Sequence, residues 1–174
     1  MAQAPRKERD VLMRALVVTA VLLISGSALA QSTGVPPATV KNELPQLKQI
    51  DRFALLPAAI QKGDFSVDGA SARGWQMAEP GARFSATDVP VPGAPGRRLI
   101  FAACDSTFCL IHYERGGIAH FYEILALSNR SREWQVVWNV RGRKPLASLN
   151  ALRARLRSGT LGPNWDLPAV RRDF

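Results

Sequence analysis

"RLIFAACDSTFCLIHYERGGIAHFYEILALSNRSREWQVVWNVR", residues 98–141, carries the clearest structural signal in the chain. Four runs within it are rich in β-branched and aromatic residues, a composition typical of strands. They cover about residues 98–104, 109–115, 118–128 and 133–141. The connections between them are short, and short connections join antiparallel neighbours. The pattern therefore predicts a β-meander.

The sequence of the last strand and of the segment after it predicts a strand and a helix that pack against each other. Apolar residues alternate with polar ones along the strand, which indicates one buried face. These apolar residues are Trp134, Val136, Trp138 and Val140. The segment "PLASLNALRARLRSG" predicts a helix that begins at Pro145 and ends at Gly159. We expect its stripe of leucines to pack on the tryptophan face of the strand; they are Leu146, Leu149, Leu152 and Leu156.

The segment before the meander predicts a second helix, from Leu44 to Lys62. Its apolar residues recur at helical spacing: Leu44, Leu47, Ile50, Ala54 and Leu55. Pro45 suits a first turn and Gly63 an end, whereas Pro57 should divide the helix and leave a short one over residues 57–62. In residues 64–97 we expect short strands around "GWQMA" and "ARFSATDV".

These elements place the chain in the α+β class. We expect an antiparallel β-meander of about four to six strands, with the N-terminal and C-terminal helices packed on one face. Residues 44–174 are long enough for a single domain with one core, and residues 31–43 form a flexible, proline-containing lead.

Residues 1–30 have the layout of a secretory signal peptide. Basic residues precede the apolar run "ALVVTAVLLISGSALA", and the small residues Ala28 and Ala30 predict cleavage after Ala30. An uncleaved anchor is the alternative, but the run is shorter than the roughly 20 residues that span a bilayer. We expect a periplasmic or secreted protein with no integral membrane segment in the mature chain.

The chain has two cysteines, Cys104 and Cys109, on either side of the turn "DSTF". Residues directly opposite on antiparallel strands lie about 4.5–5.5 Å apart at Cα, within reach of a disulfide. Export favours oxidation, so we expect a structural disulfide. A redox pair usually has two intervening residues rather than four, and a metal site would require further ligands nearby.

The charge of +9 is unevenly distributed along the chain. Residues 31–129 hold nine basic and nine acidic side chains, whereas residues 130–174 hold ten basic and three acidic ones. The candidate binding residues are therefore Arg141, Arg143, Lys144, Arg153, Arg155 and Arg157, with Arg171 and Arg172 near the terminus. The alternative is that these side chains serve solubility and favour the helix dipole.

The sequence contains none of the common catalytic motifs. The one concentration of titratable residues is His112, Glu114, His120 and Glu123, around the "ERGG" turn. A two-residue turn at Gly116 and Gly117 would place the two histidines on opposite faces, and a three-residue turn would place them side by side. We favour the two-residue turn, because it gathers the apolar residues on one face, and expect no enzyme activity, cofactor or metal.

The leading hypothesis is a small exported, non-catalytic binding or assembly protein. Its basic C-terminal region would contact an anionic envelope component or a protein partner, and export excludes nucleic acid. One alternative is a hydrolase or metal-dependent enzyme with a site at His112, Glu114 and His120; another is a purely structural envelope subunit. The sequence leaves the ligand and the oligomeric state open.

Overall fold

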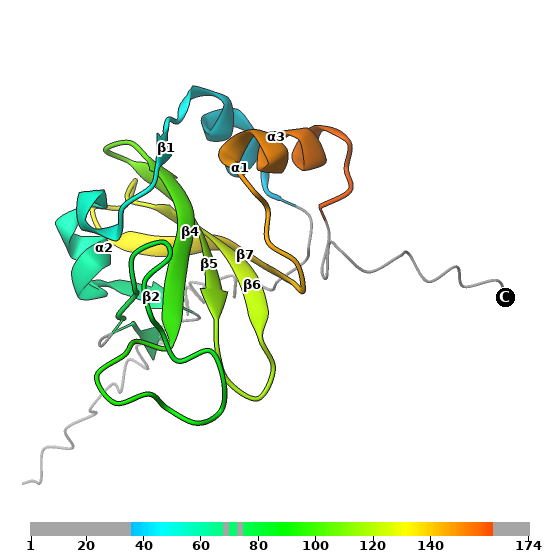
Figure 1. Cartoon of the computed structure of the whole chain (residues 1–174). Coiled ribbons are helices and arrows are strands. Elements are labelled where there is room, and N and C mark those ends of the chain that lie inside the picture. The colour runs from blue at the N-terminus through cyan, green and yellow to red at the C-terminus, as the bar shows by residue number, and fades with distance from the viewer. Residues whose placement is uncertain (1–35, 68–69, 73–74, 162–174) are drawn as a thin grey trace, which may run out of the picture.

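The computed structural model describes residues 36–67, 70–72 and 75–161 (Figure 1). Its centre is an antiparallel meander, which confirms the predicted strands. The strands are β4 (Arg97–Cys104), β5 (Phe108–Arg115), β6 (Phe121–Ser128) and β7 (Trp134–Gly142). Three short strands extend it: β1 (Gln49–Ile50) on β4, β2 (Phe65–Val67) parallel to β7, and β3 (Ala70–Ser71) on β2. The result is a mostly antiparallel sheet in the order β1-β4-β5-β6-β7-β2-β3, with helices, so the α+β class is confirmed.

Helices lie on both faces of this sheet, so the expectation of one covered face is wrong. Helix α1 (Ala38–Glu43), the 3-10 turn η1 (Leu44–Gln46) and helix α3 (Leu149–Arg157) contribute to one apolar core. Helix α2 (Ala58–Lys62) belongs to the core on the opposite face, together with Trp75. Alternate residues of β5 enter the two cores, and this strand is buried along almost its whole length.

The single buried face predicted for the last strand is also wrong. Val137 is an extra residue in β7, because Ala126 pairs with Trp138 while Leu127 pairs with Val136. Such a bulge reverses the alternation of side chains between the faces. Trp134 therefore joins the core under α2, whereas Trp138 joins the core under α1 and α3.

The long helix expected from Leu44 to Lys62 is replaced by a chain that passes from one face to the other. The segment continues after η1 into β1, then into a 3-10 turn, η2 (Phe53–Leu55), and then into α2. Leu44 packs in one core and Ile60 in the other, so one continuous helix could not bury both. The short helix predicted after Pro57 is confirmed, and Gly63 ends it at φ 73°.

Two further boundaries differ from the expected ones. Helix α1 begins at Ala38, inside the expected flexible lead, and its Val40 is fully buried. Helix α3 begins at Leu149 rather than at Pro145, because the Ser148 side chain accepts a hydrogen bond from the Ala151 amide at 3.2 Å and caps the helix.

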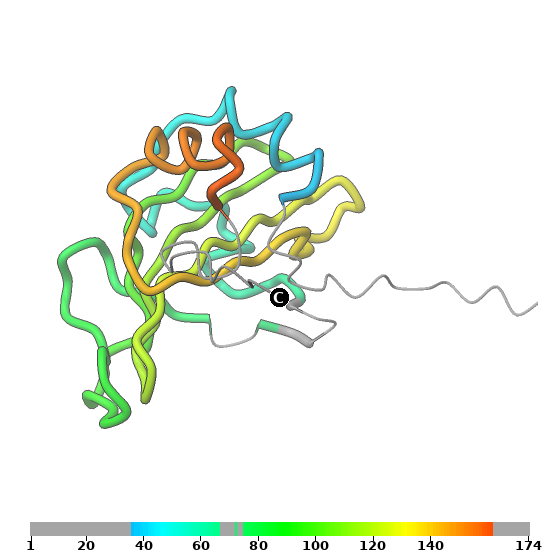
Figure 2. Tube along the Cα trace, turned by 90° about the vertical axis from the view of Figure 1, so that its right-hand side faces the viewer, coloured from blue at the N-terminus to red at the C-terminus, as the bar shows by residue number. Residues whose placement is uncertain are grey.

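Between β3 and β4, the described residues contain less strand than expected. Around "GWQMA" there is one isolated bridge, from Ala78 to Arg98. The described residues 82–89, the "ARFSATDV" segment, contain no strand. They belong to a long loop that lies beside the turn between β5 and β6 in both views (Figures 1 and 2).

The turn between β5 and β6 has five residues, 116–120, so both registers considered from the sequence are wrong. Arg115 pairs with Phe121, and His112 pairs with Ile124. Tertiary packing explains the longer turn: a Cβ added to Gly116 would lie 1.8 Å from the Ser85 carbonyl oxygen of the neighbouring loop.

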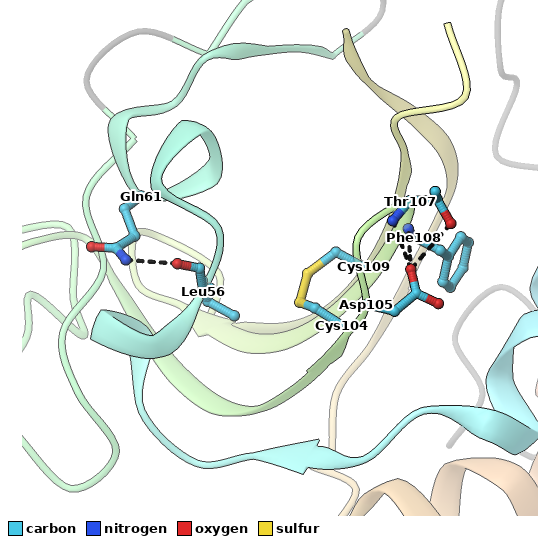
Figure 3. Close-up of a disulfide and its surroundings, with 7 residues drawn as sticks. All are labelled: Leu56, Gln61, Cys104, Asp105, Thr107, Phe108 and Cys109. Atoms are coloured by element: carbon cyan, nitrogen blue, oxygen red, sulfur yellow. Dashed lines mark hydrogen bonds between the residues drawn. A yellow bond between two sulfur atoms is a disulfide. The ribbon is translucent and has the colours of Figure 1, made fainter. Parts of the chain in front are cut away.

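The turn between β4 and β5 matches the expectation. Cys104 and Cys109 are directly opposite each other, with Cα atoms 4.1 Å apart, and form a disulfide. The Asp105 carboxylate accepts hydrogen bonds from the amides of Thr107 at 2.7 Å and Phe108 at 2.8 Å and closes the turn (Figure 3). Side-chain and covalent links together fix the register of this hairpin.

In the part of the chain that the structure describes, no helix has the length and apolar composition that crossing a membrane requires. The predicted signal peptide, residues 1–30, lies outside the described residues, as do Arg171 and Arg172.

Candidate functional site: a basic groove beside helix α3

A groove lies between the α1–η1 segment and α3, which are neighbours at one end of the molecule in both views (Figures 1 and 2). Its volume is 330 Å³, at the lower end of the range of about 300–1,000 Å³ found for small-molecule sites. Three cationic and three apolar side chains line it: Lys41, Leu44, Pro45, Arg153, Leu156 and Arg157. The groove thus joins an apolar surface to positive charge.

Arg153 holds the two walls of the groove together. Its Nε donates to the carbonyl of Leu44 at 3.2 Å, and its Nη2 donates to the carbonyls of Leu44 at 2.9 Å and Leu47 at 2.6 Å. Its Nη1 donates to the side chain of Asn150 at 3.0 Å. Because these acceptors lie on two segments far apart in the sequence, the guanidinium fastens α3 to η1.

Lys41 and Arg157 differ from Arg153 in having open side chains. Both are exposed, and within the described residues neither side chain has a hydrogen-bonding or ion-pairing partner. A cation that is not neutralised by its own protein attracts anions more strongly than a paired one. Among the described residues, these two side chains are therefore the groove's cations without a partner.

The other predicted cations lie elsewhere. Arg141 donates to the Glu123 carboxylate from Nε and Nη2, each at 2.9 Å, and its guanidinium lies 4.8 Å from the ring centre of Phe121. Arg143, Lys144 and Arg155 do not contribute to the groove lining. Of the six residues predicted, the structure brings two, Arg153 and Arg157, to one site.

Sequence reasoning missed Lys41. It lies in the segment expected to be a flexible lead, and charge counting drew attention only to residues after 130. The apolar residues Val40 and Leu44, four positions apart, are the sequence signal that could have indicated a helix there.

No known relative guides the assignment of this groove. No protein-family model matches the chain, and comparison with the curated proteins and with the solved structures finds no match.

The other candidate cluster, at the β5–β6 hairpin, is divided between the two faces of the sheet. His112 is fully buried beside the Phe101 ring, where Nδ1 donates to the Glu123 carbonyl at 2.9 Å and Nε2 accepts from the Leu146 amide at 3.0 Å. Burial lowers the pKa of His112 to about 4, although the bond to Glu123 opposes this shift. His112 is thus a neutral structural link between the sheet and the segment that leads to α3.

His120 lies at the edge of the same face, with 41% of its side chain exposed. Its Nε2 is 3.0 Å from the buried Glu114 carboxylate, which is also paired with Arg98. The ring of His120 stacks on Tyr122 at 5.2 Å. The Glu114 carboxylate thus orients His120, and Arg98 partly neutralises the charge of this carboxylate.

Glu123 faces the opposite core and is 2% exposed. Its carboxylate accepts from the Tyr113 hydroxyl and from Arg141, and Arg115 lies 3.7 Å away. Burial, followed by the charge of Glu123, raises the pKa of Tyr113 well above its usual value. The four titratable residues considered from the sequence therefore do not form one site, and no group of three metal-ligating side chains occurs in the described residues.

Proposed function

We propose that the protein is an exported, non-catalytic binding or assembly protein whose basic groove holds an anionic component of the cell envelope or an acidic group of a protein partner. The observation that carries the proposal is the pair of open cations, Lys41 and Arg157, beside an apolar lining. Export is supported by the leader-like first thirty residues and by the disulfide, which is typical of oxidising compartments.

Co-sedimentation tests this proposal. The mature chain is mixed with anionic vesicles and with purified cell-wall polymer, and the bound fraction is compared with that of the double variant Lys41→Gln/Arg157→Gln. Arg83→Gln is the matched control, because it removes an exposed cation from the loop at the other end of the sheet. We expect the double variant to lose binding and the control to retain it; equal binding by all three proteins would refute the proposal.

A second candidate function is a hydrolase that uses the hairpin. The contact between exposed His120 and Glu114 favours it, since a carboxylate often orients a catalytic histidine. His112 contributes little to this candidate because the backbone engages both of its ring nitrogens. Turnover of chromogenic ester and phosphoester substrates that disappears in His120→Gln would support the hydrolase, and turnover that persists in the variant would remove it.

A further inference from the structure

The groove combines two kinds of surface that few ligands match together. Its lining combines apolar side chains with the cations Lys41 and Arg157, whereas Arg153 is hydrogen-bonded to backbone carbonyls. A ligand that satisfies this lining requires an anionic end and an apolar body within 330 Å³.

Larger anionic partners fit this arrangement less well. Segments that attach to anionic bilayers usually carry clusters of about four to eight basic residues, and the groove has two available cations. A charged polymer would leave the apolar lining exposed, and its charges would extend past the two cations. A small molecule uses both surfaces at once.

We propose that the groove binds single molecules of a single-chain anionic amphiphile, a carboxylate or a phosphate ester on one alkyl chain. The head group contacts Lys41 and Arg157, and the chain lies on Leu44, Pro45 and Leu156. This inference rests on the proposed function and names its ligand class. The head group's chemistry is shared by fatty acids and by lipid phosphates, which the experiment separates.

Isothermal titration calorimetry of the mature, oxidised chain tests the ligand class. The probes are decanoate and decyl phosphate, each below its critical micelle concentration, with decyl maltoside as a neutral probe of the same chain. We expect saturable binding of at least one anionic probe and weak or undetectable binding of the neutral one. The affinities of decanoate and decyl phosphate are then compared to show which head group the groove prefers.

Variants locate the binding. Lys41→Gln/Arg157→Gln should weaken binding of the anionic probe by about tenfold or more, because two charge-assisted contacts are lost. Leu156→Ser should also weaken it, and Arg83→Gln should leave it unchanged. Arg153 is left intact in all variants, because its removal would separate the walls of the groove. Thermal melting confirms that each variant is folded.

Three results would overturn the inference. Binding that is unchanged in the double variant would place the ligand elsewhere, and equal binding of the neutral probe would remove the role of charge. Attachment to anionic vesicles or polymer without binding of the monomeric probes would also overturn it. If that attachment depended on Lys41 and Arg157, the proposed function would survive. If nothing bound, the inference and the binding of an envelope component would both fail.

Discussion

Acidification should destabilise this protein, and His112 is one cause of the loss. Its imidazole is buried and neutral, and burial lowers its pKa from 6.5 to about 4. Between these two values the unfolded chain binds a proton that the folded chain does not, so the free energy of unfolding falls as the pH falls. Compared with its value at a pH above the unfolded pKa, the free energy of unfolding is lower by about 2 kcal/mol at pH 5 and by about 3 kcal/mol at pH 4.

Urea unfolding measures this loss at about pH 7.5 and about pH 5. The wild type should lose stability between these pH values. His112→Gln should lack the contribution of this residue, because the glutamine side chain does not titrate. The change with pH is the readout, so a lower absolute stability of His112→Gln does not matter. NMR titration of the native wild type gives the same information without a variant. A native pKa of His112 near 6.5 would refute the reasoning.

Three further outcomes follow from the packing. Replacing Cys104 and Cys109 together by alanine should lower the free energy of unfolding by about 2 kcal/mol, because the bond closes a small ring, and a null effect in denaturation curves would contradict this. Glu123→Gln should cost about 1.5 kcal/mol or more by the same measurement, since a buried Tyr113 hydroxyl loses a charged partner, and an unchanged midpoint would argue against that bond. Gly116→Ala should cost about 1–3 kcal/mol in thermal melts through its clash with the neighbouring loop, while Gly96→Ala, which meets nothing within 4 Å, should be close to neutral; equal effects would count against the packing described.

The meander could be predicted from the sequence because its information is local. Each strand carries its own β-rich composition, and turn residues such as Asp105 mark the connections. The disulfide followed from the same reasoning, since residues on either side of a short turn are opposite each other. Local signals of this kind do not depend on the rest of the fold.

The distribution of side chains between the faces could not be predicted, because bulges decide it. Ile100 and Val137 are the extra residues in their strands, and nothing in their neighbourhood in the sequence distinguishes them from regular strand positions. The five-residue hairpin turn likewise depends on contact between Gly116 and the distant Ser85. Both features arise from tertiary packing.

The sequence predicted two of the three cations that line the groove. The arginines of α3 stood out because they are concentrated in one helix, but their roles depend on partners about a hundred residues away. Arg153 reaches the carbonyls of η1, which leaves Arg157 and the unpredicted Lys41 as the open charges. Charge counting finds cations, and only the fold separates those that are engaged from those that are available.

Amide NMR spectra of the isotope-labelled mature chain, recorded during titration with decyl phosphate, test the role of the groove most directly. Saturable shifts should concentrate in α1, η1 and the last turns of α3, with little change in the loop that carries Arg83. Shifts confined to other parts of the molecule, or no saturable shifts with any anionic probe, would contradict the account.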